Sequence, residues 1–153
     1  IMPQIAIAGG FATEDQVFKG LALGAPYIGL VAIGRAAMAA ANIGKQVGDL
    51  IKKGTVPKEY QRYGNTIEEI FGDIRELKVV YGDETANISP GAIGVYSLIN
   101  RISAGLKQLM ALNRKFSLEY IDRSDIVPLT DLASRVTGLC TYEALVKKEL
   151  DSI

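Results

Sequence analysis

The sequence contains no histidine, no tryptophan and a single cysteine among its 153 residues. Without histidine, the chain cannot supply an imidazole metal ligand or the base of a Ser-His-Asp or Cys-His catalytic group. Because Cys140 has no second cysteine to pair with, an internal disulfide and a thiolate metal cluster are excluded as well.

The sequence also lacks an excess of either charge, since 17 basic residues balance 17 acidic ones. Such a chain has no field that would attract nucleic acid or an acidic membrane surface. The longest apolar runs, at residues 27–33 and 36–41, are too short to span a bilayer, and no signal peptide is visible. Hydrophobic residues make up 48% of the chain, which predicts a folded domain, with the cytoplasm as the expected compartment.

Two short apolar runs that end in glycine organise the first part of the chain: residues 5–11 (IAIAGGF) and residues 27–35 (YIGLVAIGR). Between them, Thr13 and Gln16 have the spacing of a capping box, in which each side chain satisfies a backbone amide at a helix start. Gly24 suits a left-handed helix exit. The segment is therefore predicted to be a strand-helix-strand unit with two parallel strands and a right-handed crossover.

The candidate site residues lie where these two strands should end. Gly9 and Gly10 let backbone amides approach an anion closely, with a helix amino end expected just behind them. Gly34 repeats the arrangement, and Arg35 adds a guanidinium that matches phosphate oxygens. The pattern predicts that Gly9, Gly10, Gly34 and Arg35 bind one phosphate. The alternative is that the glycines only form tight turns between strands and helices.

The remaining sequence is mainly helical in pattern. A helix is predicted over residues 35–53, where small side chains at 36–41 permit close packing against another element. Residues 54–65 have the composition of a linker. Further helices are predicted over residues 66–81, over residues 90–112 behind a Ser89 cap, and over 130–136 and 141–150. A loop is predicted at 83–89, and a short strand or extended segment at 117–121.

Several single residues carry more local predictions. Gly82 is a plausible helix cap. Gly94 and Gly105 each cost about 1 kcal/mol inside a helix, so we expect close helix contacts there or a helix break. Arg123 and Asp125 are expected to form a structural ion pair. Cys140 is expected to be a small buried residue and not a nucleophile.

The same residues resemble a known family. The front motif comprises residues 3–11, 20–25, 28–29 and 33–37, and the tail adds 70–71, 76–78, 81–82, 90–96, 105–110, 125–126 and 137–138. Together they resemble the FMN-binding domain of the glutamate synthase family, in its archaeal-type or stand-alone form. The front motif is shared with other phosphate-binding barrels, whereas the tail points to this family.

This resemblance implies a fold and a domain organisation. A complete (β/α)8 barrel needs roughly 200 to 250 residues. The chain would therefore be α/β, with the last two βα units of a TIM-type barrel (residues 1–53), a linker (54–65) and a mainly helical C-terminal extension (66–153). We interpret it as a C-terminal piece of a longer polypeptide.

The resemblance also implies a function, that of an FMN-dependent oxidoreductase in glutamate biosynthesis, with Gly9, Gly10, Gly34 and Arg35 at the FMN phosphate. No catalytic residue is expected here, because the family's catalytic lysine and its ring-binding and substrate-binding residues come from earlier strands. No cysteine lies between Arg35 and Leu139, so the family's iron–sulfur cluster cannot be held here. The expected partners are FMN and either the upstream barrel or a second copy of the chain.

A second class of function stays open beside this one. The chain could be a non-enzymatic helical module that self-associates or docks on the missing barrel, since an unpaired parallel strand pair is prone to association. A yellow preparation would favour the flavoprotein, and a colourless oligomer would favour the module.

Overall fold

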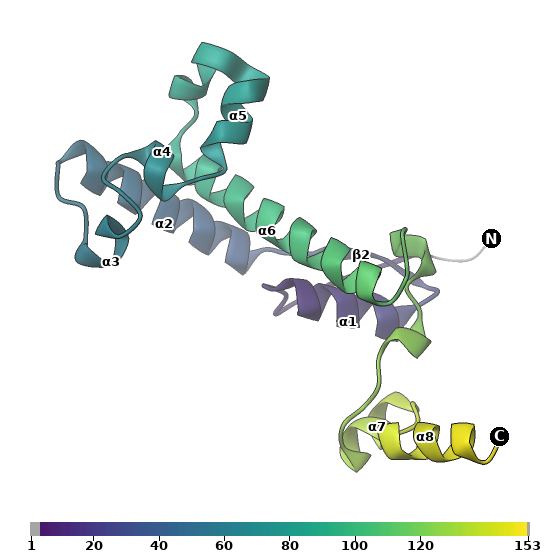
Figure 1. The fold of residues 1–153 in the computed structure, drawn as a ribbon. Helices are drawn as coiled ribbons and strands as arrows, with labels where there is room; N and C mark the ends of the chain where they lie inside the picture. The colour runs from purple at the N-terminus through teal and green to yellow at the C-terminus, as the bar shows by residue number, and fades with distance from the viewer. Residues whose placement is uncertain (1–3, 153) are drawn as a thin grey trace. The chain divides into compact units, whose positions relative to one another are not determined.

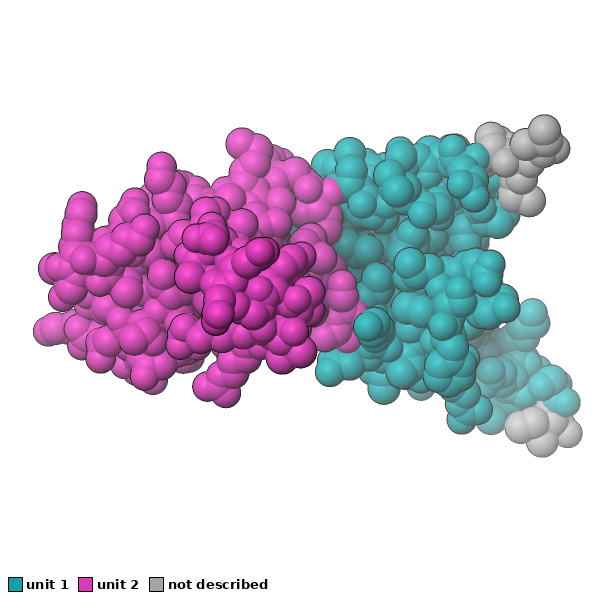
Figure 2. Space-filling view, turned by 90° about the horizontal axis from the view of Figure 1, so that it is seen from above, with its two compact units in different colours: residues 1–32, 105–153 teal, residues 33–104 magenta. Residues whose placement is uncertain are grey.

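The computed structural model describes residues 4–152, so Pro3 of the front motif lies outside it. The described chain is mainly helical and contains two parallel strands (Figure 1). It forms two compact units, residues 1–32 with 105–153 and residues 33–104 (Figure 2). The long helix α6 (Pro90–Leu112) contributes residues to both units. The predicted division at residues 54–65 rests on the resemblance and remains a prediction.

The first unit begins with the predicted strand-helix-strand segment, which is confirmed as β1 (Ile5–Ala8), α1 (Glu14–Gly24) and β2 (Ile28–Ala32). The strands pair in parallel from Ile5 and Ile28 to Ala8 and Ala32, with one irregularity at which Gly29 has no counterpart. Helix α1 packs on β2 through an apolar stripe at helical spacing: Val17, Phe18, Leu21 and Ala22 are all buried.

The prediction for Gly24 is wrong. Gly24 does not adopt a left-handed conformation, and α1 ends instead through Ala25, whose backbone is extended ahead of Pro26. Glycine is required there for space: a Cβ on Gly24 would lie 2.1 Å from Cδ1 of Ile28.

Beyond α6, the first unit continues through short elements: the 3₁₀ turns η2 (Leu118–Tyr120) and η3 (Arg123–Asp125), then α7 (Asp131–Thr137) and α8 (Tyr142–Leu150). Residues 118–120 therefore form a 3₁₀ turn and not the predicted short strand or extended segment. Its alternation does not reflect a sheet face, because Leu118 and Tyr120 are exposed and Ile121 is the buried anchor. Local bonds satisfy the backbone instead, with the Tyr120 amide donating to the Ser117 carbonyl at 3.1 Å.

Two other local predictions for this region are wrong. Arg123 does not pair with Asp125; its guanidinium donates to the carbonyls of Leu23 and Thr137, near the carboxyl ends of α1 and α7. Asp125 belongs to a different ion pair, with Lys115. Cys140 is exposed, because it lies in the short turn between α7 and α8.

The second unit holds α2 (Arg35–Lys52), α3 (Lys58–Gln61), α4 (Ile67–Ile70), α5 (Ile74–Tyr81), the 3₁₀ helix η1 (Gly82–Asn87) and the first turns of α6. The expected close packing is confirmed, since α2 and α6 lie side by side (Figure 1). A Cβ on Gly94 would lie 2.5 Å from the Ala40 carbonyl oxygen, and one on Gly44 would lie 2.4 Å from that of Pro90. Gly105 has a close neighbour as well, in the first unit: a Cβ there would lie 2.5 Å from Cγ of Glu14.

The single helix predicted over residues 66–81 is interrupted at Phe71, whose ψ of 82° leaves the helical region. The break lets Phe71 pack on a buried cluster of Ile74, Leu77 and Ile93, so tertiary packing overrides helical periodicity. Gly82 caps α5 with φ of 55°, as predicted. The predicted linker contains α3, and η1 occupies most of the predicted loop at 83–89. In the part of the chain that the structure describes, no helix is long and apolar enough to cross a membrane.

Candidate phosphate-binding segments

The two strands end at the same edge of the sheet, since Ala8 and Ala32 are paired in the parallel register. Gly9 and Gly10 follow β1 within the first unit, whereas Gly34 and Arg35 begin α2 and belong to the second unit. The four predicted site residues thus form two local pairs. That these pairs converge on one phosphate remains a prediction.

Gly9 and Gly10 have the backbone that an anion-binding turn requires. Their φ angles are 118° and 76°, a region that glycine adopts readily and other residues rarely. A Cβ built on either residue would meet nothing within 4 Å. Within residues 4–152, neither amide donates a hydrogen bond to the protein. Both N–H groups are therefore available to a ligand.

The helix start behind this pair is less suited to an anion than the sequence-based expectation implies, because nearby amides are occupied and the first turn is acidic. Gln16 accepts hydrogen bonds through Oε1 from the amides of Ala12 (2.8 Å) and Thr13 (3.3 Å). Glu14 and Asp15 add negative charge in the first turn. A hydrogen bond from Lys19, helped by one from Thr13, lowers the pKa of Asp15 to about 2, so this carboxylate stays ionised. These acids were the sequence signal that α1 would not attract an anion.

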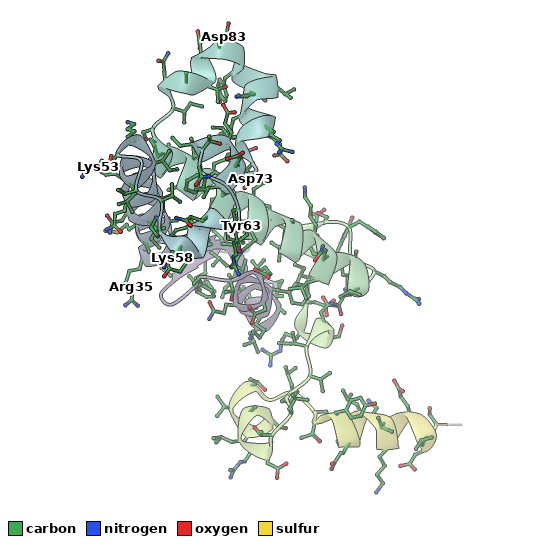
Figure 3. All side chains as sticks on the ribbon, turned by 60° about the vertical axis from the view of Figure 1, so that its left-hand side comes forward. Arg35, Lys53, Lys58, Tyr63, Asp73 and Asp83 are labelled. Carbon is green, nitrogen blue, oxygen red and sulfur yellow. The ribbon has the colours of Figure 1, made fainter. Side chains whose placement is uncertain are left out.

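The start of α2 is different in each of these respects. Its N-cap is Gly34, which has no side chain to cap the helix, and the first turn contains no acidic residue. A Cβ on Gly34 would meet nothing within 4 Å, so the space beside the first amides is open. Arg35 is exposed, and its side chain extends away from the helix (Figure 3). An 18-residue helix with an uncapped amino end presents free N–H groups and the positive end of its dipole.

The open helix start at Gly34 and the Arg35 side chain together could accommodate an anionic group. Backbone amides at a helix start and a guanidinium together suit a phosphate group. The described residues contain no cluster of three or more histidine, cysteine or acidic side chains that could hold a metal ion.

No protein-family model, no curated protein and no solved structure matches this chain.

Proposed function

We propose that this chain is the FMN-phosphate-binding C-terminal part of a glutamate synthase-like flavin oxidoreductase of the cytoplasm. The observation that carries the proposal is the start of α2, where Gly34 leaves the helix amides uncapped and Arg35 adds a guanidinium. Gly9 and Gly10 support it with two free amides in a conformation suited to glycine. The family resemblance supplies the identity of the anion as the phosphate of FMN.

We further propose that β1–α1–β2–α2 forms the last two βα units of a TIM-type barrel. A parallel sheet is normally covered on both faces. Here Ile5 is 49% exposed and Leu30 is 60% exposed, although both lie in strands. Upstream barrel strands would cover such side chains, so the expected partner is the preceding part of the barrel.

The residues present fit the phosphate end of the cofactor and no more of it. When bound, FMN would supply electron transfer in the parent enzyme. This chain would hold and orient the phosphate through the amides at Gly9, Gly10 and Gly34 and through the Arg35 side chain. The expectation that the catalytic residues lie upstream is unchanged.

The test compares FMN with riboflavin, which lacks the phosphate, in a titration followed by flavin fluorescence and by amide NMR shifts. We expect FMN to bind more tightly and to shift the amides of Arg35 and Gly10. Arg35→Gln should weaken the binding of FMN by roughly tenfold, because one charge-assisted contact is lost, and should leave the binding of riboflavin unchanged. Lys45→Gln, further along α2, is the matched control and should leave both ligands unchanged.

A second substitution makes the test sharper. Gly34→Asp introduces a good helix cap into open space, so it should keep or raise the melting temperature of the chain. The new carboxylate would occupy the amides and repel phosphate, and FMN affinity should fall. Equal affinity for FMN and riboflavin, or an unchanged affinity in the Gly34→Asp protein, would refute the proposal.

The alternative, a helical module that self-associates or docks on the missing barrel, is favoured by the exposed apolar side chains of the strands. Sedimentation velocity of the colourless chain, with and without FMN, separates the two. A concentration-dependent dimer that is indifferent to FMN would favour the module.

A further inference from the structure

The first unit contains a cavity of about 750 Å³ at the other edge of the sheet. One wall is formed by Ala25 and Pro26, in the connection that precedes β2, and the other by residues 114–116 and 119–123. Since the strands are parallel, this is the edge at which they begin, opposite to Gly9 and Gly10. The volume lies within the range of small-molecule sites, about 300 to 1,000 Å³.

Arg114 lines this cavity in a conformation that an arginine rarely adopts. Its φ is 56°, and it follows α6 at the position where a helix usually ends in glycine. The hydrogen bonds are those of a Schellman motif, with the Arg114 amide donating to Ala111 at 3.0 Å and the Lys115 amide to Met110 at 2.9 Å. Glycine would fit this backbone at no steric cost. Stability therefore does not explain why an arginine, and not a glycine, occupies this position.

The other charged groups of the cavity make hydrogen bonds or ion pairs within the protein. Lys115 Nζ contacts Asp122 Oδ2 at 2.9 Å and Asp125 Oδ1 at 3.6 Å. Arg123 donates to two main-chain carbonyls, and Glu119 accepts from the Ser117 hydroxyl at 3.2 Å. By contrast, Arg114 has no carboxylate within 4 Å among residues 4–152. Glu119 likewise has no cation within 4 Å among these residues, but the lining has three positive side chains (Arg114, Lys115 and Arg123) against two negative ones (Glu119 and Asp122), so its net charge is positive.

Two aromatic side chains line the same cavity and are largely exposed to solvent. Phe116 is 85% exposed and Tyr120 is 58% exposed. Aromatic faces of this kind stack on planar rings. Because Lys115, Asp122 and Asp125 tie the segment together, the two aromatic residues lie on a fixed loop.

We propose that this cavity binds a small planar aromatic anion, with the Arg114 guanidinium on the anionic group and Phe116 and Tyr120 against the ring. A nucleoside monophosphate and an aromatic carboxylate share this chemistry. The site is distinct from the proposed FMN-phosphate segments and does not depend on them.

The experiment titrates the whole chain with AMP, adenosine and 4-hydroxybenzoate by calorimetry or ligand-observed NMR. We expect AMP or 4-hydroxybenzoate to bind with a Kd below about 1 mM, and the stronger of the two identifies the source of the anion. Adenosine, which has the ring without the charge, should bind at least tenfold more weakly than AMP if AMP is the ligand. Phe116→Ala should weaken binding about fivefold or more, as expected for a lost stacking contact.

The decisive variant is Arg114→Gly. It should abolish ligand binding and raise the melting temperature by roughly 2 to 4 °C, because glycine relieves the left-handed residue. Arg101→Gln, an exposed arginine of α6 outside the cavity, is the control and should change neither property. Failure of both anions to bind, or unchanged binding in the Arg114→Gly protein, would overturn the inference. A lower melting temperature would do so too, since Arg114 would then have a structural role.

Discussion

Replacing Gly44 by alanine tests the tightest helix contact in the second unit. On an isolated helix the change would be favourable, because alanine exceeds glycine in helix propensity by about 1 kcal/mol. In this structure the added Cβ would lie 2.4 Å from the Pro90 carbonyl oxygen and 3.2 Å from Cα of Gly91. Both neighbours are backbone atoms, which cannot turn aside as a side chain can. The first turn of α6 would therefore have to move.

The size of the effect follows from the gain in helix propensity and the cost of the steric clash. To restore an ordinary contact, which begins at 3.4 Å, α6 must retreat by roughly 1 Å at Pro90. Overpacking of this kind costs typically about 1–3 kcal/mol, and a backbone neighbour places Gly44 in the upper half of that range. After the gain in propensity, we expect a net destabilisation of about 1–2 kcal/mol. For a chain of this length, the melting temperature should fall by about 2–8 °C.

Thermal unfolding followed by far-UV circular dichroism measures this shift. Gly72→Ala is the matched control, because a Cβ there meets nothing within 4 Å and its φ is not positive, so its stability should hold or rise slightly. Ala39→Gly, on the exposed side of α2, should lower stability by about 1 kcal/mol and so measures the propensity term separately. A Gly44→Ala chain that melts above the parent would refute the close contact between α2 and α6.

Three further predictions use the same assay. Gly105→Ala should change the free energy of unfolding by less than about 1 kcal/mol, far less than Gly44→Ala. The close neighbour of Gly105 is the Glu14 side chain, which can rotate away. That rotation would expose the buried, unpartnered Oε2 of Glu14 to water. Thr66→Ala should destabilise the chain by about 0.5–2 kcal/mol, since the Thr66 hydroxyl caps α4; Thr66→Ser, which keeps the hydroxyl, should not. Asp122→Asn should lower the melting temperature at neutral pH and lose this effect as the pH falls from 3.8 to about 2.

The pH window for Asp122 follows from its surroundings. Hydrogen bonds from Ser124, and then from Lys115, hold the pKa of Asp122 at about 2 in the folded chain, against 3.8 in the unfolded one. A depressed carboxylate pKa stabilises the folded state above the unfolded pKa, and this contribution disappears as the pH drops through the folded pKa. Because the side chain is half exposed, the effect should be small. Asp83→Asn, an exposed residue of η1, is the control, and a pH-independent difference for Asp122→Asn would contradict the assignment.

The strand-helix-strand segment could be predicted from the sequence because its signals are local and agree with one another. Two apolar runs, a capping box and a helical stripe all give the same answer over residues 5–32. The break at Phe71 could not be predicted, since the periodicity continues through it and the cause is a distant cluster around Ile93. The prediction for residues 117–121 was wrong for a related reason. A β-strand needs a neighbouring strand to pair with, and no local sequence pattern reveals whether one is present.

The candidate site was predictable in part for the same reasons. The left-handed backbone of Gly9 and Gly10 and the open start of α2 at Gly34 follow from residue type and position. The capping box at α1 was interpreted as a helix signal, and its consequence for anion binding, together with that of the acidic first turn, was not drawn. The unusual conformation of Arg114 has no sequence signature, because arginine at a helix end ordinarily indicates a solvated cation.

Four of the described helices begin with a side-chain cap, whereas α1, α3 and α5, like α2, have no side-chain bond to their first amides. Thr66, Thr130 and Thr141 each accept a hydrogen bond from an amide of the helix that follows, and Ser89 does the same for α6. Such a cap is worth about 1 kcal/mol relative to alanine, but only a few tenths of a kcal/mol relative to glycine. At Gly34 the space for a capping side chain is open and the backbone is not left-handed, yet the residue is glycine. A serine there would serve a simple turn equally well and stabilise α2, so a glycine that leaves these amides free is better explained by a ligand that uses them.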